Sequence, residues 1–273
     1  MPLRASLRFD QNQQSPAIIN CAALFSRGDS MDCNLSLVSH YKKYFCMVKA
    51  SSPEMKKIAF NIRYRVYFEE QNMIANDALS KERLETDLWD ACSIHTLLYH
   101  KPSGQPIGNV RLVPLDASPT KTLPIEKTYP NPFDFSRAPV HDIRSGKTGE
   151  VSRMLILSSF RRRKSDKSYD LGNEESSEDQ SNKRFPINYL PVCLIFATAI
   201  LMLEEKLDYG VALMEPRLAR LLMRFGVGLS RIGEAADYFG LRAPYLIFPE
   251  LIYKNLSPDY QALYDAIQSE LID

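Results

Sequence analysis

Apolar residues recur along the chain in short runs, some with the alternating spacing of strands and others with the spacing of helices. Ser52 suits a helix N-cap and Pro53 the first helical turn, so we expect a helix from there to about Glu70. Aromatic and β-branched runs predict strands at residues 44–48, 93–99, 107–113, 150–157, 209–214, 229–232 and 245–248. The helical spacing predicts further helices at residues 187–206, 217–225 and 258–271.

This order of elements predicts an α/β fold with one mixed central sheet and helices on both of its faces. Residues 1–40 are mostly polar and predict a weakly ordered arm. Residues 41–273 are expected to form a single domain. Within it, the proline-rich residues 114–149 predict an extended insertion with short helical pieces, and the polar residues 164–185 a disordered loop.

The composition is typical of a soluble protein, with 45% hydrophobic residues, 25% charged residues and a net charge of +1. This balance favours neither nucleic acid nor an acidic membrane surface as a partner. The cysteines form no CxxC pair and the histidines lack metal-ligand spacing, which indicates free thiols in a reducing compartment and no metal site. The apolar run at residues 189–203 is short for a membrane span and predicts a buried helix, and the N-terminus lacks a signal-peptide pattern. We therefore expect a cytoplasmic protein without a transmembrane segment.

Charged residues interrupt or flank the apolar runs in four places, at residues 63–67, 85–90, 107–111 and 150–153. Charges inside core structure are costly unless they pair with one another or serve a site. The four segments are therefore expected to meet in one active site.

In this order and spacing, these segments resemble the GNAT acyltransferase superfamily. Within it they are most similar to the branch of acyl-homoserine-lactone synthases and long-chain N-acyl amino acid synthases, and there to the acyltransferases associated with PEP-CTERM/exosortase systems. The likeness spans about residues 41–249 and implies a GNAT fold with splayed central strands. It is carried by residues 63–70, 85–90, 93–95, 107–114, 150–153, 214–222, 225–226 and 242–245.

The resemblance implies an N-acyltransferase that moves a long-chain fatty acyl group from acyl carrier protein to the α-amine of an amino acid. Acyl carrier protein would be partner and co-substrate, and no bound cofactor is implied. A GNAT enzyme using acyl-CoA, a homoserine-lactone synthase and a non-catalytic acyl or carrier-protein sensor stay open as alternatives. No glycine occurs between residues 150 and 171, where a pyrophosphate loop would lie, which argues against acyl-CoA. Met73 stands where lactone synthases favour tryptophan and argues against lactone chemistry.

Arg63 lies beside the apolar face of the first predicted helix. The resemblance implies that Arg63 and Tyr67 belong to a charged cluster on the acceptor side of the site. The alternative is a surface arginine paired with Glu69 or Glu70.

Asp87 and Asp90 precede a strand and can hold an arginine through two carboxylates or orient a substrate ammonium group. The alternative is a pair of turn or N-cap aspartates. Arg111 lies inside a strand and, if buried, needs a carboxylate from Asp87, Asp90 or Glu150, whereas a solvent-facing arginine is its alternative. The resemblance places Asp87 and Arg111 among the catalytic residues and Asp90 in the cluster, with Trp89 packed over it.

Glu150 and Arg153 begin the strand predicted at residues 150–157. Their odd spacing puts them on opposite faces of a regular strand, but the GNAT fold has a β-bulge there that would change this. The resemblance implies that Glu150 helps remove a proton from the acceptor amine and that Arg153 orients Glu150. A surface pair between Glu150 and Arg153 is the alternative.

The donor side is expected at the end of the same strand. The resemblance implies that this strand splays from residues 209–214 and that the pantetheine arm lies in the gap, where backbone groups polarise the thioester carbonyl. A following basic run suits a phosphate and an acidic carrier protein, or a solvated flank that balances the acidic residues 174–179. The predicted donor contacts are Leu155, Ile156, Leu157, Arg161, Arg162 and Arg163.

Overall fold

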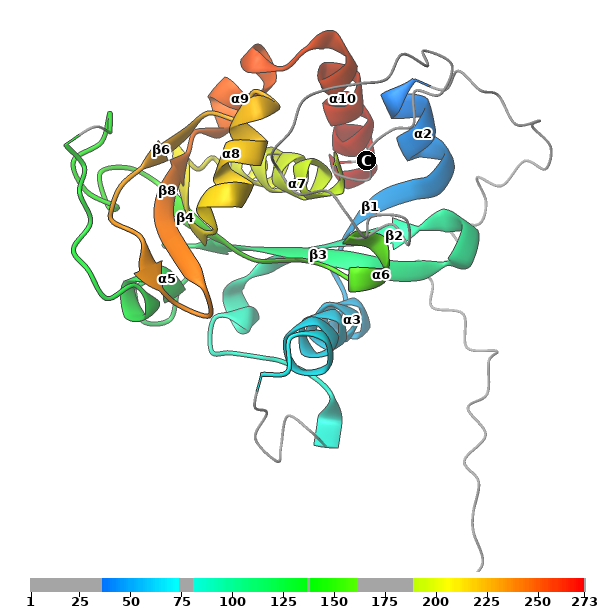
Figure 1. The fold of residues 1–273 in the computed structure, drawn as a ribbon, viewed down its shortest axis with the longest axis horizontal. Coiled ribbons are helices and arrows are strands. Elements are labelled where there is room, and N and C mark those ends of the chain that lie inside the picture. Colours follow the sequence, from blue (N-terminus) through cyan, green and yellow to red (C-terminus); the bar gives the residue numbers. More distant parts are fainter. Residues whose placement is uncertain (1–35, 74–80, 137, 162–188, 273) are drawn as a thin grey trace, which may run out of the picture. The chain divides into compact units, whose positions relative to one another are not determined.

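A mixed β-sheet runs through the part of the chain that the computed structural model describes, which is residues 36–73, 81–136, 138–161 and 189–272 (Figure 1). The strand order is β1-β2-β3-β4-β5-β8-β6, and β7 pairs with β8. β4 and β5 run parallel, whereas the other neighbouring strands are antiparallel. The strands are β1 (Phe45–Lys49), β2 (Ile94–His100), β3 (Gln105–Pro114), β4 (Thr148–Ile156), β5 (Tyr209–Met214), β6 (Leu229–Arg231), β7 (Ala236–Asp237) and β8 (Leu241–Ile247).

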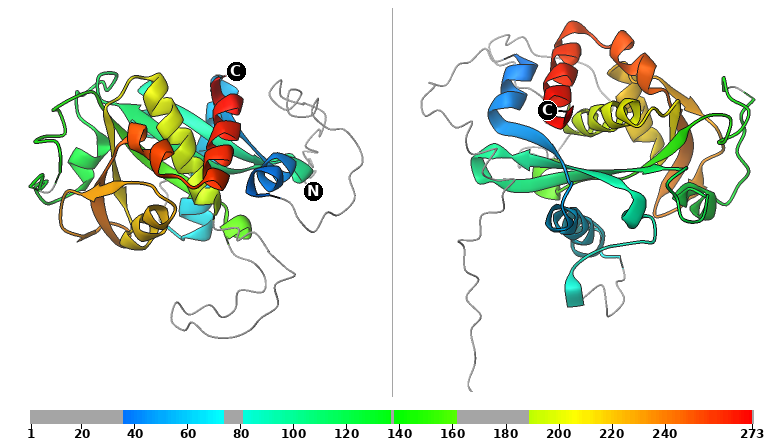
Figure 2. Two further views of the ribbon diagram at one scale, coloured as in Figure 1. Left: turned by 90° about the horizontal axis from the view of Figure 1, so that it is seen from above. Right: turned by 180° about the vertical axis from the view of Figure 1, so that it is seen from behind.

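Helices cover both faces of this sheet, which confirms the predicted fold class. α3 lies on one face, whereas α2, α7 and α10 lie on the other (Figures 1 and 2). α7 is buried along most of its length, as its apolar sequence requires, and no described helix is long and apolar enough to cross a membrane. The helices are α2 (Leu37–Tyr44), α3 (Pro53–Tyr64), α5 (Pro124–Thr128), α6 (Ser158–Arg161), α7 (Leu190–Glu204), α8 (Pro216–Arg224), α9 (Pro249–Asn255) and α10 (Pro258–Ile272).

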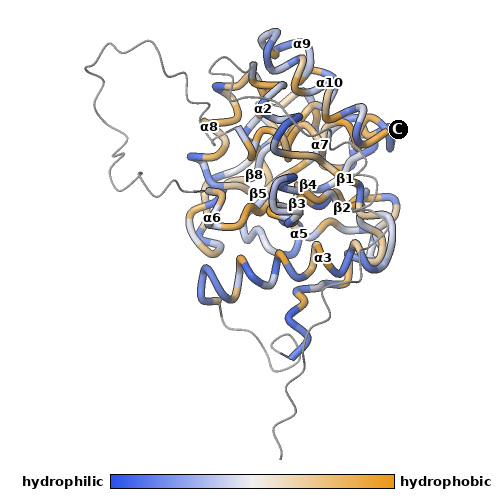
Figure 3. The backbone as a smooth tube through the Cα atoms, turned by 90° about the vertical axis from the view of Figure 1, so that its right-hand side faces the viewer, coloured by the Kyte–Doolittle hydropathy of each residue, from blue (hydrophilic) through white to orange (hydrophobic). Residues whose placement is uncertain are grey.

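The helix α3 begins where the sequence predicts. The Ser52 hydroxyl accepts a hydrogen bond from the Met55 amide at 3.3 Å, and Pro53 occupies the first turn. Hydrophobic and hydrophilic residues alternate along α3 (Figure 3), and its apolar Ala59 and Ile62 are buried. At Tyr64 the α-helix gives way to a π-helical segment, Arg65–Glu70. The expected helix is thus correct in extent, but its last six residues are wound more widely.

α2 begins at Leu37, inside the arm expected from the polar N-terminal sequence. Its Tyr41 is fully buried and donates a hydrogen bond from its hydroxyl to the Glu270 carboxylate of α10 at 2.5 Å. Glu270 also accepts from the Met47 amide at 2.8 Å, so one carboxylate joins α2, β1 and α10. A contact between such distant residues cannot be seen in the local pattern.

The insertion at residues 114–149 packs more closely than an extended segment would. It contains α5 and supplies Leu123, Ile125 and Tyr129 to a second apolar cluster, which also includes Trp89 and Val211. This cluster is separate from the main core, and the main core is the one that includes the buried residues of α7. It places α5 directly beside the start of β4.

Candidate active site

β4 contains a bulge at the position expected for the fold. Asn109 of β3 lies opposite Leu155, and Arg111 lies opposite Ser152, so residues 153–154 together face a single residue of β3. Arg153 takes up the bulge with a positive φ of 53°, a left-handed conformation that costs a residue with a side chain about 1 kcal/mol or more. The bulge turns Arg153 to the same pocket as Glu150, although regular spacing would separate them.

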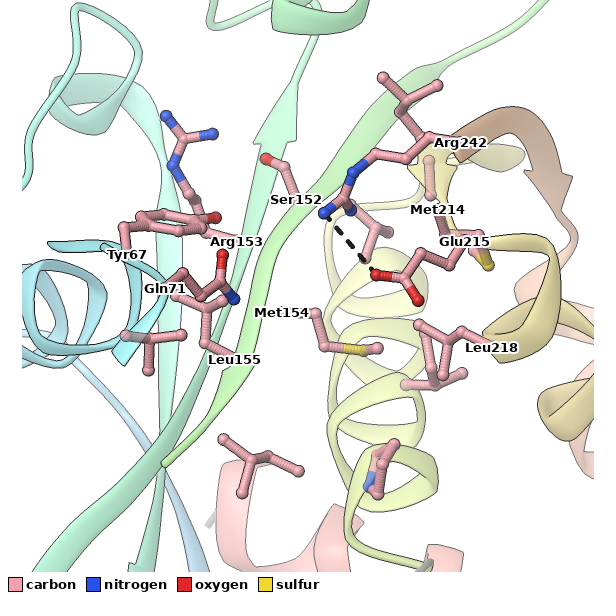
Figure 4. A pocket seen from close by; sticks show the side chains of 17 residues that line it. Tyr67, Gln71, Ser152, Arg153, Met154, Leu155, Met214, Glu215, Leu218 and Arg242 are labelled. Atoms are coloured by element: carbon pink, nitrogen blue, oxygen red, sulfur yellow. Dashed lines mark ion pairs between the residues drawn. The ribbon is translucent and has the colours of Figure 1, made fainter. Parts of the chain in front are cut away.

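β4 and β5 diverge after their first three residue pairs, which end at Glu150 and Val211. A cavity of about 290 Å³, here called the strand-gap cavity, lies where they separate (Figure 4). Residues 151–156 form one wall and residues 212–214 the other. The predicted splay is therefore present, and the gap that it opens is lined largely by apolar side chains.

A second cavity of about 150 Å³, the Glu150 pocket, adjoins the first and shares several wall residues with it. Glu85, Glu150, Arg153 and Arg242 supply its charged lining, and Pro124 and Thr128 of α5 form part of its uncharged wall. The walls common to both cavities are Tyr67, Gln71, Val151, Ser152, Arg153, Leu213 and Arg242.

Arg63 is fully buried and lies in an ion network, not on the surface. Its Nη1 donates to the Asp90 carboxylate at 2.6 Å, and its Nε donates to Glu85. Burial alone would raise the pKa of Glu85, but the guanidinium groups of Arg63 and Arg153 outweigh it and lower that pKa. Sequence reasoning gave Glu85 no role, although it stands in the charged segment at residues 85–90.

Arg111 is also fully buried and is held by both predicted aspartates. Its Nη1 donates to Asp87 at 2.7 Å and to Asp90 at 2.9 Å, and its Nε donates to the Ser152 hydroxyl at 3.1 Å. Burial opposes ionisation of Asp90, but the two arginines that it accepts from lower its pKa to about 2. Burial lowers the pKa of the neighbouring His95 to about 3, so this imidazole is uncharged. The solvent-facing alternative for Arg111 is wrong.

Arg153 closes the network from β4. Its Nη2 donates to Glu85 at 2.9 Å and to Asp87 at 3.1 Å, and its guanidinium lies over the Tyr67 ring, 5.7 Å from the centroid. The expected pairing with Glu150 is wrong, because the bulge aims Arg153 at the carboxylates of the 85–90 segment instead. Tyr67 lies in the cluster as predicted and lines both cavities.

Glu150 stands apart from these ion pairs. It is almost fully buried, and its carboxylate accepts a hydrogen bond from the Ile125 amide at 2.6 Å. Burial is the main cause that raises its pKa to about 7, against the opposing effects of that amide and of Arg111 and Arg153. A carboxylate with this pKa exchanges protons near neutrality. The alternative of a surface pair with Arg153 is wrong.

Trp89 does not pack over the ion network as expected. Its indole donates to the Thr122 carbonyl at 3.0 Å and lies in the second apolar cluster, with the Lys127 ammonium 5.0 Å from the ring. Only its backbone amide reaches the network, at 3.0 Å from the Asp87 carboxylate. The indole anchors the segment that presents the aspartates.

The predicted donor contacts are only partly described. Leu155 and Ile156 line the strand-gap cavity, whereas Leu157 is buried and lies outside its lining. α6 ends at Arg161, but the side chain of Arg161 and the whole of Arg162 and Arg163 lie outside the described residues. Their predicted phosphate and carrier-protein contacts stay predictions.

The bulge, the splayed strands and the helices on both faces define the fold as that of the GNAT acyltransferases. A family model described as an acetyltransferase (GNAT) domain matches residues 62–169, a span that contains the whole ion network and β4. No curated protein sequence matches the chain.

Solved structures of AHL synthases and of an N-acyl amino acid synthase share this fold. LasI, an AHL synthase, superimposes with a TM-score of 0.50 at 16% identity, covering 78% of this chain and 95% of LasI. FeeM, an N-acyl amino acid synthase from uncultured soil microbes, gives a TM-score of 0.50 at 12% identity, covering 80% of this chain and 97% of FeeM. BjaI, a CoA-dependent acyl-homoserine lactone synthase, gives a TM-score of 0.50 at 14% identity, covering 82% of this chain and 89% of BjaI. At these identities the likeness establishes a shared fold.

Proposed function

We propose that this protein is an N-acyltransferase that moves a long-chain fatty acyl group from acyl carrier protein to the α-amine of an amino acid. The strand-gap cavity beside the Glu150 pocket is the observation that supports this most directly. An extended acyl-pantetheine chain suits a narrow gap between two diverging strands. An amine in the adjoining pocket would meet the thioester where the two cavities share walls.

In the proposed reaction, Glu150 takes a proton from the acceptor amine. A base is needed because an ordinary amine is mostly protonated at neutral pH, and a base with a pKa of about 7 is well matched to that pH. That first proton passes to solvent, and the neutral amine nitrogen bonds to the thioester carbon. As the carbon–sulfur bond breaks, Glu150 takes a second proton from the nitrogen of the tetrahedral intermediate and passes it to the leaving thiolate. Backbone N–H groups of β4 beyond Glu150 have no partner in β5 and would stabilise the oxyanion.

The ion network would hold the acceptor side of this site in shape. Arg153 and Glu85 form an ion pair in the wall of the Glu150 pocket. Arg63, which pairs with Glu85, and Arg111 lie fully buried outside that wall. Asp87 links Arg111 to Arg153. We assign Asp87, Arg111 and Arg153 to positioning, because their charges are already paired with one another.

The surface of α8 favours acyl carrier protein over acyl-CoA as the donor. Arg217, Arg220 and Arg224 are exposed, share one side of the helix by their spacing, and have no ion-pair partner in the described part of the chain. Glu215 and Leu218, at the start of α8, line the strand-gap cavity. A row of exposed arginines beside the cavity suits an acidic protein carrying the acyl chain.

The test is a product assay with purified protein. Acyl carrier protein loaded with dodecanoyl, tetradecanoyl or hexadecanoyl chains is incubated with each proteinogenic amino acid, and amide products are detected by mass spectrometry. An N-acyl amino acid formed in proportion to enzyme supports the proposal. Parallel reactions with acyl-CoA and with S-adenosylmethionine identify the two enzymatic alternatives. Tight binding of the acyl chain without any product would indicate a sensor and refute the proposal.

A further inference from the structure

Arg242, the second residue of β8, lies where the two cavities meet. Figure 4 shows its guanidinium reaching into the strand-gap cavity from the side opposite Tyr67 and Arg153. The side chain is only 26% exposed, so its charge is partly removed from solvent. The reaction as proposed gives this arginine no role.

The positive charges of the other arginines of the site are already paired with carboxylates. Arg63, Arg111 and Arg153 each contact two carboxylates of the network. Arg242 differs, because its nearest carboxylate oxygen among the described residues, on Glu215, is 3.9 Å from its Nη2 and therefore beyond hydrogen-bond distance. Glu215 is itself more than half exposed and well placed to be solvated by water instead.

The orientation of Arg242 is fixed by a different group. Its Nε donates to the Tyr238 carbonyl at 2.9 Å, in the turn between β7 and β8. This bond leaves the terminal nitrogens to face the cavity. A guanidinium held in this way offers two parallel N–H groups, which match the two oxygens of a carboxylate.

We infer that Arg242 binds the carboxylate of the acceptor, so that the enzyme selects amines carrying a carboxylate; this rests on the proposed function. In an amino acid, the amine and the carboxylate are separated by one carbon. Arg242 and Glu150 line the same pocket, so the acceptor would present its carboxylate to the first and its amine to the second. On binding, the acceptor carboxylate would accept the hydrogen bonds of the Arg242 terminal nitrogens, which Glu215 at 3.9 Å does not accept.

The experiment compares the best amino acid acceptor with its carboxamide, using wild type, Arg242→Gln and Arg242→Lys. Wild type should favour the free acid in kcat/KM by about tenfold to a hundredfold, the range expected for a charge-assisted hydrogen bond. Arg242→Gln should lose that preference, because the KM for the acid should rise about tenfold or more above any change in the KM for the carboxamide. Arg242→Lys should retain part of the preference, because it keeps the charge and loses the fork.

Arg231→Gln is the matched control, because Arg231 also donates from Nε to a backbone carbonyl and from Nη2 to a glutamate, but lies outside both cavities. It should behave as wild type. Acyl transfer that is indifferent to the carboxylate in wild type, or a preference that survives in Arg242→Gln, would overturn the role of Arg242 while leaving the proposed function intact.

A binding measurement decides the case in which no amine is acylated and the proposed function fails. Calorimetry then compares N-dodecanoylglycine with its carboxamide on wild type and Arg242→Gln. Tighter binding of the acid, lost only in the variant, supports the carboxylate site. Equal affinities for the acid and the carboxamide in wild type overturn it.

Discussion

Asp90 and Glu150 are both buried acidic side chains of the site, but their pKa values differ widely. Arg63 and Arg111 contact Asp90 and bring its pKa to about 2, despite the opposing effect of burial. Burial dominates for Glu150, whose direct hydrogen bond comes from a backbone amide, and its pKa rises to about 7. The environments of these carboxylates thus separate a permanently charged structural group from one that exchanges protons.

Replacing Glu150 with glutamine should slow acyl transfer by about 10²- to 10⁴-fold, the usual contribution of a general base. In wild type, kcat/KM should rise as the pH increases through about 7, because the raised pKa keeps Glu150 protonated, and inactive as a base, below that pH. Glu150→Gln should lose this limb and retain only the one that reports ionisation of the amine. Stopped assays from pH 5 to 9 measure both.

Glu234→Gln serves as the control, since Glu234 is exposed and lies outside both cavities. A Glu150→Gln enzyme with wild-type rate and an unchanged pH profile would exclude Glu150 as the base.

Individual contacts were predictable from sequence only where one local rule decides them. Arg111 inside a strand requires a carboxylate, and Asp87 and Asp90 both supply one. The partner of Arg153 could not be read in this way, because the bulge changes the direction of its side chain. Spacing along the chain carries no information on the size of that change.

Strands and long helices were predicted well because each carries its own periodic pattern. β5 spans the predicted residues, and the hairpin of β2 and β3 and the N-cap of α3 are also confirmed. α2 and α9 were missed, because short helices depend on contacts distant in sequence more than on their own propensity. The π-helical segment has no recognised sequence signal, since it differs from an α-helix only in its hydrogen-bond spacing.

Charge reversal on α8 tests how the donor docks. The double variant Arg217→Glu/Arg220→Glu should raise the KM for acyl carrier protein by about tenfold or more, because like charges then face the acidic carrier. The kcat/KM for the same acyl chain on free pantetheine should not change. Raising the salt concentration should increase the KM for acyl carrier protein more in wild type than in the variant.

Arg231→Glu reverses a charge on β6 and should leave both substrates unaffected. Equal effects of the α8 variant on the carrier protein and on the small thioester would place the defect inside the cavity and argue against docking on α8.

The ion network joins parts of the domain that are far apart in sequence. It connects α3, the 85–90 segment, β3 and β4 through three arginines and three carboxylates, so its formal charges cancel. Networks of this kind cost free energy to desolvate, and removing one member leaves its partners buried and unpaired. The geometry of the site and the stability of the fold therefore depend on the same residues.

Arg63→Met should lower the free energy of unfolding by about 3–5 kcal/mol, because Glu85 and Asp90 lose a buried partner. Urea unfolding monitored by circular dichroism measures this. The lowered pKa of Asp90 means that its contribution is present above its ordinary pKa and is lost as the pH falls towards 2. The deficit of the variant should therefore narrow in acid.

Arg83→Met provides the comparison, since the Arg83–Glu69 pair is exposed, and it should cost about 1 kcal/mol or less. An Arg63→Met protein as stable as Arg83→Met would show that the network does not support the fold.

The mutual pairing of the network also limits how this protein can diverge. Substituting any one of its six members destabilises the fold unless a partner is substituted as well. Changes at these positions are therefore unsuited to altering substrate specificity. The walls of the Glu150 pocket that carry no charge are free of that constraint. Descendants that accept a different amine should therefore differ at Phe68, Met73, Pro124, Thr128 and Phe239 while inheriting the arginines and carboxylates unchanged.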